Sequence, residues 1–210
     1  MLGLSDTTFP STSRLMGELT SVGVVQMDNA QSLVGEGGII SAADLRDFCR
    51  TAPEEDALLA RLFASALGAV ERRYALVLRP STVTAEYVGA CHGAVLPRGP
   101  VAAESALVVE ALSADGVART VDAPLLGGGL RPSITSAGGG LLCGIAERLR
   151  VTYAAGYAAG AVPPEVVQAL CILTSDLYAH RETRVVGTVV ARMPEMVDLL
   201  LSDLAPPAFG

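Results

Sequence analysis

The spacing of apolar residues predicts two helices in the first third of the chain. Ser41 and Asp44 form the S-x-x-D pattern that begins many helices, and the apolar stripe after them predicts a short helix over 41–50. Thr51 is a candidate cap for a longer helix over 54–74. The apolar positions of this longer helix recur about every four residues: Leu58, Leu59, Leu62, Phe63, Ala66, Leu67 and Val70.

After Pro80 the pattern changes to strict alternation, which is typical of half-buried strands. Val83, Ala85 and Tyr87 share one face of the first predicted strand, and the segment around Val151 alternates in the same way. Two further runs flank Asp115-Gly116, a pair that tolerates positive φ and predicts a hairpin turn. Residues 124–144 contain two glycine triplets and predict a long loop or poorly paired strands.

Two helices are predicted near the end of the chain. Pro163-Pro164-Glu165 begins a helix that we expect to reach about Arg184 and that is apolar on most sides. Such a helix is usually buried both inside its own domain and against a partner. Met193-Pro194-Glu195 begins a short terminal helix that continues to Leu204.

Together these elements predict an α+β fold that is mainly helical. We expect a helical bundle of two N-terminal helices, one long C-terminal helix and one short terminal helix, with a small antiparallel β-sheet inserted. Residues 1–38 show no sustained period and are interpreted as an N-terminal extension or arm. The remaining ranges are one domain over 39–204, divided into helices at 39–78, a β insert at 80–154 and C-terminal helices at 163–204, and a tail at 205–210.

Composition removes several classes of function. The net charge is −7, and all fifteen basic residues are arginine, so lysine Schiff-base chemistry and a P-loop lysine are absent. An acidic chain is not expected to grip DNA, because duplex affinity comes largely from cations. No apolar run has the length of a membrane span, and the first fifteen residues lack the pattern of a signal peptide, so we expect synthesis in the cytoplasm.

We expect no catalytic residue, no metal and no cofactor. The four cysteines lie far apart in sequence and are interpreted as reduced, small apolar residues: Cys49, Cys91, Cys143 and Cys171. The glycine triplets lack the residues that complete a phosphate loop. Cys91 and His92 are adjacent in an extended segment, which points them to opposite faces, and His180 and Glu54 lie at helix ends where their charges suit the helix dipole.

Four segments resemble the head–tail connector (adaptor) proteins of long-tailed phages and gene transfer agents. They are VTYAAGY at 151–157, VPPEVVQAL at 162–170, YAHRE at 178–182 and VVGT at 185–188. Met193-Pro194 with Val197, Leu200 and Leu201 is similar to the closing segment of that family, and the resemblance covers about residues 39–202.

The resemblance implies a non-enzymatic protein of the virion neck. Members form a ring, commonly of twelve copies, beneath the portal protein and extend the DNA channel toward a stopper or tail-completion protein. DNA is then expected to pass through without sequence-specific binding, and no membrane is involved.

Two sets of contact residues are expected. The C-terminal segment combines arginines, a glycine link and a short apolar helix, and its expected portal-binding residues are Arg181, Glu182, Arg184, Val185, Val186, Met193, Pro194, Val197, Leu200 and Leu201. The expected ring interface or core residues are Leu58, Leu62, Phe63, Val70, Val166, Leu170, Leu173 and Leu177.

Three alternatives stay open at this point. The first is another neck or tail-completion ring protein, such as a stopper or tail terminator. The second is a small hydrolase that combines a serine with His92 or His180 and an aspartate. The third is an oligomeric binding module with no role in a particle.

Overall fold

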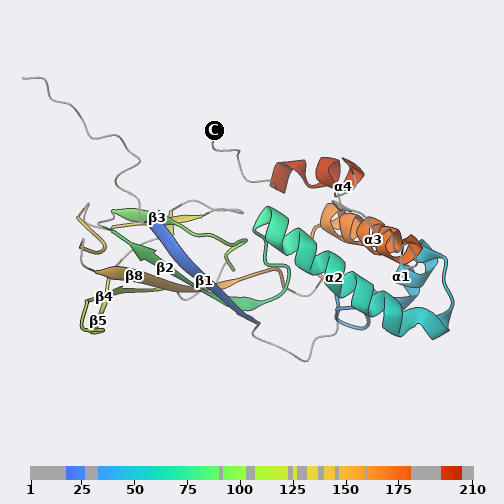
Figure 1. The fold of residues 1–210 in the computed structure, drawn as a ribbon, viewed down its shortest axis with the longest axis horizontal. Coiled ribbons are helices and arrows are strands. Elements are labelled where there is room, and N and C mark those ends of the chain that lie inside the picture. Colours follow the sequence, from blue (N-terminus) through green and yellow to red (C-terminus); the bar gives the residue numbers. More distant parts are fainter. Residues whose placement is uncertain are drawn as a thin grey trace, which may run out of the picture.

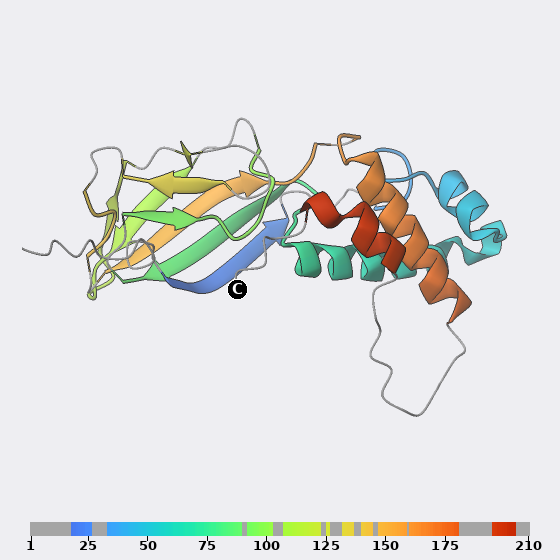
Figure 2. The same cartoon turned by 90° about the horizontal axis from the view of Figure 1, so that it is seen from above.

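A computed structural model shows an elongated molecule with β-sheet at one end and helices at the other (Figures 1 and 2). It describes residues 18–26, 33–89, 92–102, 107–122, 125–126, 132–136, 140–144, 147–158, 160–180 and 195–204. We refer to the two ends as the sheet half and the helical half. In the part of the chain described, none of the helices combines the length and the apolar character that a bilayer-crossing segment requires.

Among the described residues, the sheet half contains two antiparallel sheets that share one core. A five-stranded sheet has the order β1-β2-β8-β4-β5, and a three-stranded sheet has the order β3-β7-β6. Val83, Tyr87 and Val151 of the larger sheet are buried in one cluster with Leu96 and Ile134 from the region of the smaller sheet. The strands are β1 Glu18–Gln26, β2 Ser81–Val88, β3 Gly93–Val95, β4 Val108–Leu112, β5 Ala118–Thr120, β6 Leu125–Leu126, β7 Ser133–Thr135 and β8 Arg148–Ala155.

The helical half packs around a second, separate core. Phe63, Val70, Leu170 and Val197 are fully buried there, and residues 33–40 form a loop that packs against the same cluster. The helices are α1 Ala42–Cys49, α2 Asp56–Tyr74, α3 Pro164–Ala179 and α4 Glu195–Leu200, with short 3-10 turns η2 Pro53–Glu55 and η3 Ser202–Leu204.

The prediction of a mainly helical bundle with a small inserted sheet is wrong. The described residues form two sheets with their own core, and this sheet half is a counterpart to the helical half and not an appendage. The larger sheet also begins before the first helix, because β1 pairs with β2 along its whole length. No regular element was predicted in 1–38, which contains β1 and most of the packed loop at 33–40.

Several local predictions are confirmed. The Asp44 amide donates to the Ser41 hydroxyl at the start of α1, as the S-x-x-D pattern indicates. The hairpin at Asp115-Gly116 joins β4 and β5, with Gly116 at φ 79°. The predicted cap at Thr51 is wrong, since α2 follows the turn η2 and the Thr51 hydroxyl is buried without a hydrogen-bond partner among the described residues.

Two of the connections between the halves are short linkers that the structure describes throughout their packed residues. In the first, Leu76 and Leu78 are buried in the helical core while Val77 between them is buried in the sheet core. In the second, Gly156 adopts φ +112° directly against the backbone of Arg79. Alternate residues of one extended linker therefore anchor both cores, which fixes the orientation of the halves.

Candidate functional site

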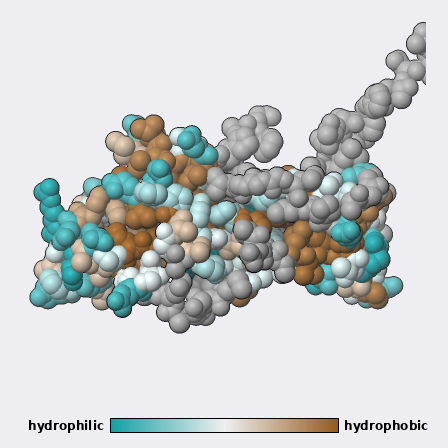
Figure 3. Space-filling view, turned by 180° about the vertical axis from the view of Figure 1, so that it is seen from behind, coloured by the Kyte–Doolittle hydropathy of each residue, from teal (hydrophilic) through white to brown (hydrophobic). Residues whose placement is uncertain are grey.

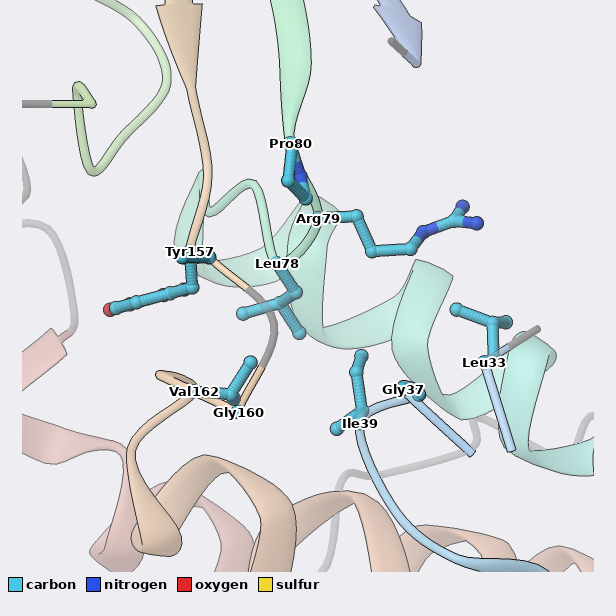
Figure 4. A pocket seen from close by; sticks show the side chains of 11 residues that line it. Leu33, Gly37, Ile39, Leu78, Arg79, Pro80, Tyr157, Gly160 and Val162 are labelled. Carbon is cyan, nitrogen blue, oxygen red and sulfur yellow. The ribbon is translucent and has the colours of Figure 1, made fainter. Parts of the chain in front are cut away.

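A pocket lies at the junction of the halves, and it is too small for a substrate. Its volume is about 50 Å³, enough for a few waters at most. Tyr157 and the Arg79 side chain extend to opposite sides of it (Figure 4), and Arg79 Nε is buried without a hydrogen-bond partner in the described part of the chain. The other lining residues are Leu33, Gly37, Gly38, Ile39, Leu78, Pro80, Ala158, Gly160 and Val162. The pocket is a small gap where the segments 33–39, 78–80 and 157–162 pack together.

The histidines considered as catalytic bases have ordinary local partners. His180 Nδ1 lies 3.2 Å from Asp176 Oδ1, one helical turn earlier on α3. His92 Nδ1 lies 3.0 Å from the carbonyl oxygen of Gly140. Over the described residues, no group of three or more His, Cys, Asp or Glu side chains is arranged to hold a metal ion.

The thiols of the helical half are held in their protonated form. Burial raises the pKa of Cys171 to about 11, with smaller contributions from Cys49 and Asp44. Burial also raises the pKa of Cys49. Cys143, in the sheet half, is also buried, and its thiol donates to the Gly89 carbonyl oxygen, whereas Cys91 lies outside the described residues. A nucleophilic cysteine needs a lowered pKa, so these environments suit packing.

The structure separates the expected portal-binding residues into two groups. Val197 and Leu201 are fully buried in the helical core, and Leu200 is half-buried. The expectation that Val197 and Leu201 contact a portal is therefore corrected. Both side chains face inward, because the inner face of α4 packs on the core of the helical half. The others lie outside the described residues: Arg181, Glu182, Arg184, Val185, Val186, Met193 and Pro194.

Most of the expected ring interface or core residues lie in the core of the single chain. The buried members are Phe63, Val70, Val166, Leu170 and Leu173. Leu58 and Leu62 are half-buried, and Leu177 is 39% exposed. Of this set, Leu177 is the most exposed member.

The most exposed apolar residues of the helical half lie on the outer face of α4. Met196 is 55% exposed and Leu199 is 69% exposed. Figure 3 shows hydrophobic side chains gathered where α4 stands out from the other helices. The sequence held a signal for this arrangement, because Val197, Leu201 and Leu204 follow the i, i+4, i+7 spacing and leave Met196 and Leu199 on the other side.

Polar contacts fix α4 on the body of the helical half. The Tyr74 hydroxyl donates to Asp198 Oδ1 at 2.6 Å, and Arg73 Nε lies 3.3 Å from the same oxygen. The hydrogen bond from Tyr74, followed by the one from Arg73, lowers the pKa of Asp198. The exposed face of α4 is therefore presented in a defined orientation.

A second exposed apolar region follows β1, an edge of the larger sheet. Leu19, Val22 and Val24 pair with core-facing residues of β2 and are 43%, 38% and 44% exposed. Where β1 reaches α2, a cleft of about 170 Å³ is lined by Val24, Gly68, Glu71, Arg72, Leu76, Val77 and Arg98. Long edge strands usually carry charges or proline that prevent pairing, and β1 has neither after Glu18.

Three solved structures that share this fold are of gene transfer agent (GTA) particles. A chain of the neck of an empty GTA particle, computed with C6 symmetry, matches with a TM-score of 0.66 and 24% identity over 89% of this chain and 95% of that chain. A chain of the virion of a native GTA particle matches with a TM-score of 0.63 and 25% identity over 87% and 94%.

A chain of the neck of a native GTA particle, computed with C12 symmetry, matches with a TM-score of 0.63 and 23% identity over 89% and 95%. No protein-family model matches the chain, and neither does any curated protein. The likeness spans nearly the whole of each neighbour. The combination of a sheet half and a helical half is therefore shared as a unit.

Proposed function

We propose that this protein is a structural component of the neck of a phage-like particle, specifically a head–tail connector that forms a ring under the portal and extends the DNA channel. The observation that carries the proposal is the shared fold, which covers about 95% of chains from GTA necks. The matched structures are particle components, and a structural role needs no catalytic site.

The charge distribution supports a channel through which DNA slides. Among described positions the helical half has twelve acidic and six basic residues, whereas the sheet half has six and four. Twelve copies of a chain with net charge −7 would carry about −84, and an acidic wall repels a polyanion instead of holding it.

The portal contact that we propose uses the C-terminal part of the chain. Its main contact residues are proposed to lie in 181–194 and not in α4. Val197 and Leu201 hold α4 on the helical core and are not available to a partner. Residues 181–194 include three arginines and one glutamate, so this segment is basic in a chain that is otherwise acidic.

The experiment is removal of the gene from the producing strain, followed by imaging of the particles. We expect heads that package DNA but lack tails, and recovery when the wild-type gene is supplied. An annular density of this fold directly under the portal supports the proposal. Normal tailed particles without the protein would refute it.

A binding assay separates a connector from a stopper or tail terminator. Portal protein should capture the wild-type chain, and the double variant Arg181→Glu with Arg184→Glu should bind at least tenfold more weakly. The matched control is Arg119→Glu, on β5 of the sheet half, which should bind as the wild type does. Capture by a tail protein and not by portal would favour the stopper or terminator function.

A further inference from the structure

The exposed face of α4 and the cleft beside β1 lie on opposite sides of α2. Arg73 and Tyr74 contact α4 through Asp198, whereas Gly68 and Arg72 line the cleft. At 3.6 residues per turn these two pairs point in nearly opposite directions from the helix axis. The helical half therefore has two different surfaces on two opposite flanks.

The first surface is a fixed apolar ridge with acidic neighbours. We call it the α4 ridge, made of Met196 and Leu199. These residues are three apart on one helix, the spacing at which side chains project together as anchors. Glu195 and Asp203 are exposed beside them, so the rim of the ridge is negative.

The second surface is an apolar cleft with a basic rim, which we call the β1–α2 cleft. Val24 is its exposed apolar side chain, at 44%, and Gly68 has no side chain to fill the cleft. Leu76 and Val77 also line it but are almost fully buried. The lining also contains Arg72 and Arg98 and a single acid, Glu71, and the Arg98 guanidinium donates to the backbone carbonyl oxygen of Glu71. The Glu71 carboxylate is already occupied, since it accepts a hydrogen bond from the Leu78 amide at 2.9 Å, and burial raises its pKa.

We propose that the α4 ridge of one copy docks into the β1–α2 cleft of the next copy. The inference rests on the proposed function and identifies which surfaces join the ring. The occupant is a second copy because the two surfaces are complementary in charge and in apolar character. A contact between two different surfaces of identical chains is heterologous, and it closes into a ring when its rotation divides the circle. The C6 and C12 symmetries of the matched necks have this property.

Photo-crosslinking in assembled particles tests the contact directly. A benzophenone amino acid at Leu199 should give a covalent dimer of this chain, with the adduct in residues 68–77, at Val24 or at Arg98 of the second copy. The control position is Val117, which is 66% exposed on the hairpin of the sheet half and should give no adduct in those residues. An adduct from Leu199 to another protein, to a different part of this chain, or no adduct at all would overturn the proposal.

Charge reversal provides a second test that does not depend on crosslinking. Arg72→Glu and Glu195→Arg should each reduce the number of copies per particle at least tenfold, and the double variant should recover most of it. Gly68→Leu should also exclude the protein from the ring while leaving its melting temperature within a few degrees, because an added Cβ meets only the flexible end of Arg72 at 3.3 Å. Single variants that assemble normally would show that the contact lies elsewhere.

The outcomes separate the contact from the proposed function. If wild-type protein is absent from particles, the proposed function fails. If it is present in a ring but the Leu199 adduct falls elsewhere, only the assignment of the two surfaces fails.

Discussion

Gly156 lies directly against the backbone of Arg79, so that a Cβ at position 156 would sit 2.1 Å from the Arg79 carbonyl oxygen and 2.6 Å from its carbon. This is where the chain leaving β8 passes the chain entering β2, on the way between the two halves. The positive φ of Gly156, +112°, is a conformation that other residues rarely adopt. Both the backbone angle and the close approach therefore require glycine.

Replacing Gly156 by alanine should destabilise the protein strongly. We expect a loss of about 3 kcal/mol in the free energy of unfolding, since a strained backbone and a clash with fixed backbone atoms act together. Urea denaturation followed by circular dichroism measures the change. Gly160→Ala is the control: it also has positive φ but has open space around it, and should cost only about 1 kcal/mol. Equal losses in the two variants would mean that the approach to Arg79 is unimportant.

The two leucines on opposite faces of α4 should behave differently. Leu201 is fully buried, and Leu201→Ala should lower the free energy of unfolding by about 2–5 kcal/mol. Leu199 is exposed, and Leu199→Ala should change it by no more than about 0.5 kcal/mol. Thermal and urea unfolding of both variants check this. A destabilised Leu199→Ala variant would contradict the assignment of Leu199 to an open surface.

The hydrogen bond from Tyr74 to Asp198 should make the free energy of unfolding depend on pH in the acidic range. The hydrogen bond from Tyr74 lowers the pKa of Asp198 from its usual 3.8, so the folded state holds fewer protons there than the unfolded state. The stabilisation by the ionised Asp198 carboxylate is fully present above pH 3.8, and it is lost as the pH falls through the lowered pKa of the folded state. Unfolding measured from pH 6 to pH 2.5 should show Asp198→Asn less stable than wild type at pH 6, with the difference shrinking toward pH 2.5.

Cys171 should resist alkylation in the folded protein. With a pKa of about 11, about one thiol in a thousand is ionised at pH 8, and the buried side chain is also shielded from reagent. Iodoacetamide at pH 8 followed by peptide mass spectrometry should find Cys171 unmodified in buffer and modified in 8 M urea. Similar rates in both conditions would show that the helical core opens readily.

The local elements of this fold could be predicted because each follows from its own residues. Alternation in β2 and β8 arises because one face of each strand meets a core. The cap at Ser41 and the hairpin at Asp115-Gly116 depend on residues that are close together in the sequence. The strand β1 carries no such signal. Both of its faces are largely open to solvent, so neither face has to be apolar, and its sequence shows no alternation of apolar and polar residues.

The candidate surfaces could be predicted only in part. The sequence indicated that the segment around α4 makes contacts, but it assigned Val197 and Leu201 to a partner when they belong to the core. In the sequence, an apolar residue that is buried by its own chain looks the same as one that is buried by a partner. Only the packing of α4 on Tyr74 and α2 distinguishes the two.

By itself the sequence determined the charge and the absence of lysine. It also determined the helices and strands whose apolar residues recur at a regular spacing. Only the tertiary structure decided the balance between sheet and helix, the pairing of β1 with β2, the inward face of α4, and the contact of Gly156 with Arg79. The physical reason is that local periods record which side of an element is apolar. What covers that side depends on residues far away in the chain.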